Sequence, residues 1–196
     1  PWLRSGAMVV CLDPAAPHSG ELPKRADISY FITHPCHPPI VNDEATSEAR
    51  ADFFGGVARQ CGVCALMQGP EADYARGEAL CCRMFAPVLR VHRITVEQMA
   101  ILEPAMAETV TLTLMVAIRE ALDEAIARGV PEAAARDFLL GHMNVNLGIL
   151  FGFLDAQVSD GAKAAVQRGR AQIMQPDWKK VFEPERILAE VRAITA

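Results

Sequence analysis

Two histidines in a proline-rich segment are the first residues whose type and spacing could do chemistry. His34 and His37 stand in the sequence HPCHPP, directly after the apolar run from Ile28 to Thr33. Prolines cannot continue a β-ladder, so this segment ends a strand and stiffens the loop that follows. An imidazole offers a nitrogen to a metal or a proton to a substrate, and a stiff loop keeps it oriented. The sequence therefore predicts ligand-binding histidines at the carboxyl end of a strand; the alternative is ordinary turn histidines.

Two carboxylates lie in a strongly apolar stretch further along the chain. Glu103 and Glu108 are embedded in LEPAMAETVTLTL. A carboxylate on a buried helix is costly unless it is paired, binds a metal or acts as an acid or base. Five residues apart, the two would project about 140° apart on a regular helix, unless Pro104 distorts it. The sequence leaves open which of them is functional and whether one points to solvent.

A third polar group precedes an apolar run. His142, Asn144 and Asn146 alternate with apolar residues in GHMNVNLG. These side chains could donate hydrogen bonds to a polyhydroxy substrate. They could equally form a helix entry in which an asparagine caps the first turn.

The elements that would position the histidines form an α/β pattern. Four segments have the apolar, β-branched character of strands, and the first of them suits a strand buried on both faces of a parallel sheet. One clear helix, from Glu71 to Phe85, lies between the third and the fourth strand. The predicted strands run from Met8 to Leu12, Ile28 to Thr33, Gly62 to Met67 and Val88 to Ile94.

From Thr95 onward the apolar residues recur at helical spacing. A helix of more than 30 residues is expected from Thr95 to about Ala127, and Gly129 and Pro131 follow as stop signals. Further helices are expected from Pro131 toward Gly141, from Asn144 to Leu154, from Ser159 to Ile173 and from Pro184 to the C-terminus. The predicted fold class is α/β followed by all-α, with domains 1–94 and 95–196.

Composition restricts the classes of partner. Hydrophobic residues make up 51% of the 196, enough for a buried core, and the net charge of -5 has no basic stripe for a phosphate backbone. We therefore expect no nucleic-acid partner. The longest uninterrupted apolar runs fall short of the ~20 residues that span a bilayer, so no membrane segment is expected. Six cysteines in apolar runs favour reduced thiols and a cytoplasmic location, and the lone CxxC of Cys61 and Cys64 lies in a predicted strand.

Several segments together resemble a known family. GAMVVCLDPAAP, FITHPCHPPIVNDE, LEPAMAETV and FLLGHMNVNLGILFG are similar to the D-apionate oxidoisomerases, which carry a phosphogluconate-dehydrogenase-like C-terminal domain. The resemblance implies that residues 1–94 are the C-terminal strands of a Rossmann NAD-binding domain. It implies that residues 95–196 form a helical, 6-phosphogluconate dehydrogenase-like substrate-binding and dimerisation domain. The sequence has no GxGxxG and starts at Pro1, so we expect the NAD-binding part to precede it.

The resemblance also implies an activity and a set of residues. The activity is the NAD-dependent oxidation and isomerisation of the sugar acid D-apionate to 3-oxo-isoapionate, with a divalent metal, expected to be zinc, as second cofactor. The implied metal pair is His34 and Glu103, with His37 and Glu108 in reserve. We expect His34, His37 and Glu103 to be catalytic, because residues 95–127 contain no lysine to serve as the acid or base of β-hydroxyacid dehydrogenases.

The remaining expectations concern substrate contacts and assembly. His142 and Asn146 are the candidates for substrate binding. The apolar helices of the second half carry more apolar surface than one small domain needs, so a homodimer is expected. The alternative is a non-catalytic helical dimerisation or metal- and ligand-binding module that does not bind NAD by itself.

Overall fold

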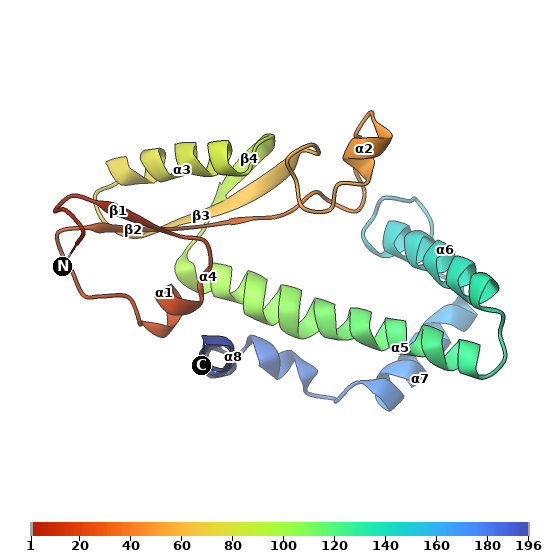
Figure 1. The fold of residues 1–196 in the computed structure, drawn as a ribbon. Helices are drawn as coiled ribbons and strands as arrows, with labels where there is room; N and C mark the ends of the chain where they lie inside the picture. The colour runs from red at the N-terminus through yellow and green to blue at the C-terminus, as the bar shows by residue number, and fades with distance from the viewer. Residues whose placement is uncertain (1, 196) are drawn as a thin grey trace. The chain divides into compact units, whose positions relative to one another are not determined.

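The chain folds into two compact units in the computed structural model, which describes residues 2–195, the last of them by its backbone alone. The first unit comprises residues 1–107 and 182–196, and the second comprises residues 108–181. Figure 1 traces the order of the elements along the chain.

A four-stranded mixed sheet forms the centre of the first unit. Its strands β1 (Met8–Cys11), β2 (Ser29–Pro35), β3 (Gln60–Gln68) and β4 (Val88–Arg93) lie in the order β1-β2-β3-β4. All four predicted strands are confirmed. The parallel pairing expected for the first strand is confirmed for β1 with β2. Strands β3 and β4 are also parallel, whereas β2 and β3 pair antiparallel. A parallel pair needs a crossover connection, usually a helix, and the segment between β2 and β3 forms only the four-residue helix α2 (Ser47–Arg50).

Helices cover both faces of this sheet (Figure 1). Helix α3 (Ala72–Met84) packs on one face, where Phe31 contacts Tyr74 and Cys81. The opposite face receives helix α4 (Val96–Ala100), with Met99 packed against Ile32. Successive side chains of a strand point to opposite faces, so neighbouring residues of β2 supply both cores.

The predicted long helix is confirmed from Val96 to Ala127, but its middle is not α-helical. Helix α4 begins at a capping box formed by Thr95 and Gln98, and it leads into the π-helix η1 (Ile101–Leu112) and then α5 (Thr113–Ala127). Pro104 lies inside η1 and has no N–H to donate to a preceding turn. π-helical turns are rare and frequently occur at functional sites.

This long helix also bears on the membrane prediction. Among residues 2–195, it is the one helix long and apolar enough to cross a bilayer, by length and composition alone. Core helices of proteins outside membranes pass the same test, and the absence of a membrane segment stays a prediction. Glu103 and Glu108 interrupt the apolar stretch of this helix, so it is not among the uninterrupted apolar runs of the sequence.

The remaining helices agree with the sequence pattern except at Gly141 and at the end of the helix predicted from Asn144 to Leu154, which stops at Leu150. Helix α6 (Glu132–Leu150) is one helix where two were predicted. Gly141 lies in its interior and does not end it, and a β-carbon at this position would meet no neighbouring atom. Helix α7 (Asp160–Ile173) is capped by Ser159, as expected. Three short helices lie in stretches for which no helix is expected from the sequence: α1 (Ala15–Ser19), α2 and the 3-10 helix η2 (Trp178–Phe182).

The C-terminal helix α8 (Pro184–Thr195) belongs to the first unit. Its Ile187 and Val191 are buried with Ala15 of α1 and with Ala100 and Ala105 of the long helix. The compact units therefore do not coincide with the ranges 1–94 and 95–196. Those ranges concern role and ancestry, and they stay a prediction.

Candidate functional site

Three of the predicted site residues line one cavity in the first unit. The cavity has a volume of about 290 Å³ and lies between the end of β2, the start of β3 and the long helix. His34, His37 and Glu103 contribute its polar groups. Its other walls are mostly apolar and come from Pro35, Cys36, Val63, Met99, Leu102, Met106 and Ala107. A mostly apolar cavity with a few convergent polar groups is typical of a small-molecule site.

The sheet fixes the position of His34. Its strand is an inner strand of the sheet, and His34 pairs with Val63 of β3 in the register. The ring Nδ1 lies 2.8 Å from the carbonyl oxygen of Leu12. A carbonyl oxygen only accepts, so Nδ1 carries the hydrogen, and in the neutral ring Nε2 then keeps its lone pair. His34 therefore offers a basic nitrogen from a ring whose tautomer is set by the backbone.

Glu103 adds a negative charge to the same side of this ring. Its Oε1 lies 3.5 Å from Nδ1 of His34. The Glu103 side chain is 18% exposed and the His34 side chain is 30% exposed. The carboxylate therefore supports the Nδ1–H form and would stabilise the imidazolium that forms when Nε2 takes a proton. A histidine held by a carboxylate at one nitrogen and free at the other is the arrangement of a general base.

His37 follows in a constrained loop conformation. Its φ of 59° lies in the left-handed region, which residues with a β-carbon occupy at a cost and which is enriched at functional sites. Its Nδ1 lies 3.2 Å from the carbonyl oxygen of Phe54, so by the same reasoning Nε2 keeps the lone pair. The rings of His34 and His37 meet edge to face with centroids 6.1 Å apart.

The geometry does not suit the implied metal pair. Glu103 approaches His34 at Nδ1, the nitrogen that donates to Leu12, whereas a metal would have to bind at Nε2. Across residues 2–195, no cluster of three histidine, cysteine or acidic side chains could hold a metal ion. The described residues therefore do not fit the implied His34–Glu103 metal pair.

The other predicted residues belong to the second unit. Glu108 is exposed and does not line the cavity. His142 lies on α6, where its Nδ1 is 2.8 Å from the carbonyl oxygen of Phe138 and its ring stacks on the Phe138 ring at 4.0 Å. It lines a largely apolar cavity of about 530 Å³ formed with α5. Asn146 is exposed on the same helix. Substrate binding by His142 and Asn146 stays a prediction.

Among the described residues, the cysteines belong to no group of side chains that could hold a metal ion. Cys61 and Cys64 lie in β3 as predicted, and residues three apart in a strand point to opposite faces. All six cysteines are free thiols. Cys36 lines the cavity, and burial raises the pKa of its thiol, so it contributes a neutral wall.

Sequence reasoning missed the groups that orient the two histidines. The carbonyls of Leu12 and Phe54 carry no sequence signal, since any residue supplies a carbonyl. Asp52, which organises the backbone around Phe54, did have a signal. The sequence DFFGG at residues 52–56 places an aspartate ahead of two glycines, which is typical of a side chain that accepts hydrogen bonds from its own turn.

Known proteins similar to this chain agree on its family. Residues 42–195 match the family model described as phosphogluconate dehydrogenase (decarboxylating) C-term. A D-apionate oxidoisomerase of Rhizobium rhizogenes is 55% identical over 98% of this chain and 70% of its own length. A D-apionate oxidoisomerase of Cupriavidus necator is 50% identical over 100% of this chain and 71% of its own length.

Solved structures share the fold of this chain. A protein from Cupriavidus necator, described as a semialdehyde dehydrogenase NAD-binding protein in complex with calcium and NAD, superposes with a TM-score of 0.96 at 50% identity. The match covers 98% of this chain and 70% of that one. An NADH-preferring ketol-acid reductoisomerase from an uncultured archaeon shares the fold at 15% identity, with a TM-score of 0.64 over 100% of this chain and 59% of its own. The resemblance found in the sequence is confirmed: this chain belongs to the D-apionate oxidoisomerase family and carries the C-terminal domain of the phosphogluconate dehydrogenases.

Proposed function

We propose that this chain acts in the NAD-dependent oxidation and isomerisation of D-apionate to 3-oxo-isoapionate, with His34 as the acid–base group. One observation carries the proposal. His34 is held at Nδ1 by the Leu12 carbonyl and the Glu103 carboxylate, and this leaves Nε2 basic in a ring that lines a cavity. The names of the relatives supply the substrate class, and a related structure in complex with NAD supports the cofactor.

Oxidation of an alcohol removes a hydride from carbon and a proton from oxygen. NAD, when bound, accepts the hydride. Nε2 of His34 takes the hydroxyl proton, and the imidazolium that forms keeps Nδ1–H directed at Leu12 and Glu103. His37, whose Nε2 also keeps its lone pair, is the second acid–base group for the proton transfers of isomerisation. The apolar walls exclude water and so strengthen these interactions.

Within residues 2–195, the chain offers no glycine-rich strand-to-helix turn for a pyrophosphate. The connection from β1 to α1 runs through Leu12, Asp13 and Pro14, without the close backbone approach that glycines permit. We therefore assign NAD contacts to no residue of this chain. The chain spans about 70% of the length of the curated relatives.

Zinc binding at His34 and Glu103 stays a prediction. The related structure is described with calcium, and nothing here favours zinc over other ions. Elemental analysis of the purified chain and of its His34→Ala variant tests this point. Stoichiometric zinc that is lost in the variant would restore the metal role of His34 and refute the acid–base assignment.

The second unit is proposed to bind a second copy of this chain. Large apolar side chains of α6 and the segment after it are exposed, among them Phe138, Leu150 and Phe151 at 68%, 70% and 74%. An exposed apolar surface of this kind is typical of a protein–protein interface. Light scattering should give twice the chain mass of 21.3 kDa, and a monomer at micromolar concentration would refute the dimer.

The acid–base role is tested by His34→Asn in the full-length gene product. Asparagine keeps an N–H donor for Leu12 but removes the basic Nε2. The rate of NADH formation from D-apionate should fall by about 100-fold or more, the usual contribution of a general base. The matched control is His92→Asn, because His92 is exposed on β4 and does not line the cavity. Unchanged kcat in His34→Asn would refute the assignment.

A further inference from the structure

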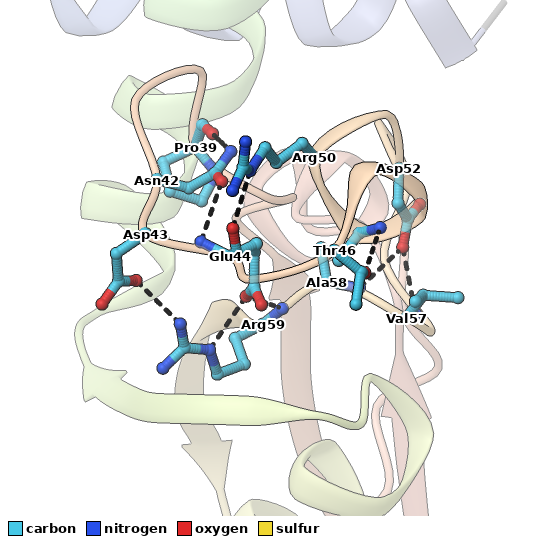
Figure 2. A network of polar contacts seen from close by, with 11 residues as sticks. Pro39, Asn42, Asp43, Glu44, Thr46, Arg50, Asp52, Val57, Ala58 and Arg59 are labelled. Atoms are coloured by element: carbon cyan, nitrogen blue, oxygen red, sulfur yellow. Dashed lines mark hydrogen bonds and ion pairs between the residues drawn. The ribbon is translucent and has the colours of Figure 1, made fainter.

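The loop between β2 and β3 is organised around one carboxylate. Asp52 accepts hydrogen bonds from four backbone N–H groups: Phe54 and Gly55 donate to Oδ1 at 3.1 and 2.9 Å, and Val57 and Ala58 donate to Oδ2 at 3.0 Å each. Figure 2 shows this carboxylate directed at the turn that contains Val57 and Ala58. These bonds hold the pKa of Asp52 at about 2, below its ordinary 3.8. The carboxylate is therefore charged throughout the neutral range.

One peptide plane links this carboxylate to the candidate site. The N–H of Gly55 donates to Asp52, and the carbonyl of Phe54 in the same peptide unit accepts from Nδ1 of His37. N–H and C=O of a trans peptide point in opposite directions, so Asp52 and His37 hold the two ends of one plane. Hydrogen bonds in such a chain polarise one another in the same sense. The charge of Asp52 thus strengthens the acceptor that His37 uses.

The conformation of this peptide depends on a glycine. Gly55 has a φ of 98°, and a β-carbon there would lie 2.1 Å from Nε2 of Gln60, so this position requires glycine. A second acidic residue of the loop, Glu44, accepts the backbone N–H and the Nε of Arg59 at 2.8 Å each (Figure 2). The loop is therefore fixed on both sides of the Phe54 carbonyl.

We propose that Asp52 is a positioning residue that holds His37 in its Nδ1–H form, so that Nε2 remains the basic nitrogen. The proposal rests on the function proposed above, because that function makes His37 an acid–base group whose Nε2 must be basic. Asp52 acts through the Gly55 N–H and the Phe54 carbonyl. A purely structural role would stabilise the loop without selecting a tautomer of His37.

The tautomer is measured directly by ¹⁵N NMR on the chain labelled at its five histidines. A His37→Gln variant assigns the His37 signals. In the wild-type chain His37 should show a protonated Nδ1 and an unprotonated Nε2. The opposite tautomer in the wild-type chain would overturn the proposal. This result does not depend on whether any variant folds.

Asp52→Asn is the informative change. Its amide group has one oxygen and one donor NH2, so at least one of the two N–H pairs loses its acceptor. The Nδ1–H population of His37 should fall and the Nε2–H population should rise. The matched control is Asp43→Asn, which removes one charge from the same loop at a side chain that is 91% exposed and bound to the Arg59 guanidinium. An unchanged His37 tautomer in folded Asp52→Asn would overturn the proposal.

Activity separates this proposal from the one on which it rests. In the full-length gene product, Asp52→Asn should lower kcat by about 10- to 100-fold, the usual cost of losing an orienting partner, with KM for D-apionate little changed. Asp43→Asn should retain wild-type kcat. A shifted tautomer with unchanged kcat would refute the catalytic role of His37 while supporting its positioning by Asp52.

Discussion

The packing of Gly77 against Phe31 makes the sharpest test of the fold that holds the site. Gly77 lies in α3, and a β-carbon there would sit 2.3 Å from Cδ2 and from Cε2 of the Phe31 ring. Ordinary contacts are more than 1 Å longer. The ring cannot yield, because Phe31 is 0% exposed and packs edge to face on Tyr74 with centroids 5.8 Å apart. Gly77→Ala must therefore push α3 off the sheet.

The expected magnitude follows from two opposing effects. Overpacking a core costs about 1 to 3 kcal/mol, and the upper end applies where the displacement exceeds 1 Å. Replacing glycine by alanine inside a helix contributes about 1 kcal/mol in the other direction. The variant should thus be less stable by about 2 kcal/mol. Amide hydrogens of β2 and β3 that exchange through unfolding of the first unit should then exchange about 30-fold faster, since 1.36 kcal/mol is tenfold.

A matched substitution isolates the packing effect. Gly141 lies inside α6 with no atom within 4 Å of a β-carbon placed there. Gly141→Ala should slow exchange in α6 through the gain in helix propensity alone. If Gly77→Ala were as stable as the wild-type chain, the close approach of α3 to the sheet, and with it the placement of β2, would be refuted.

Three further outcomes are expected. Thr95→Ala removes the side-chain acceptor of the capping box and should lower the free energy of unfolding by about 1 kcal/mol in urea titrations. The folded-state pKa of Asp52 lies at about 2, below its ordinary 3.8, so its contribution to stability is present above that ordinary value and is lost as the pH falls toward 2. Acid unfolding followed by circular dichroism should accordingly be shallower over this window in Asp52→Asn than in the wild type. Native alkylation and mass spectrometry should label exposed Cys82 and spare the wholly buried Cys64 and Cys81, and equal labelling would contradict their burial.

Local patterns accounted for most of the secondary structure. The apolar run before HPCHPP predicted β2, but the strand does not end at Thr33: it continues through His34 and Pro35, which pair with Val63 and Gly62 of β3. The capping signal at Thr95 predicted the start of the long helix. These elements follow from propensity and hydrophobic periodicity, which act over a few residues. At Gly141 the same reasoning failed, because an isolated glycine weakens a helix without ending it.

The direction of strand pairing could not be obtained this way. The residues of β2 and β3 suit either a parallel or an antiparallel partner, and the connection between them decides the outcome. The π-helical turn at Pro104 was foreseen only as a distortion of the helix.

The sequence by itself determined the residue types of the site, the positions of β2 and of the long helix, and the family. Only the tertiary structure decided that Glu103 meets His34 at Nδ1, and that Asp52 reaches His37 through the peptide between Phe54 and Gly55. The physical reason is that residue types and periodicity are local properties of the chain. Hydrogen bonds to backbone carbonyls, and contacts between residues far apart in sequence, exist only once the sheet and the helix have packed.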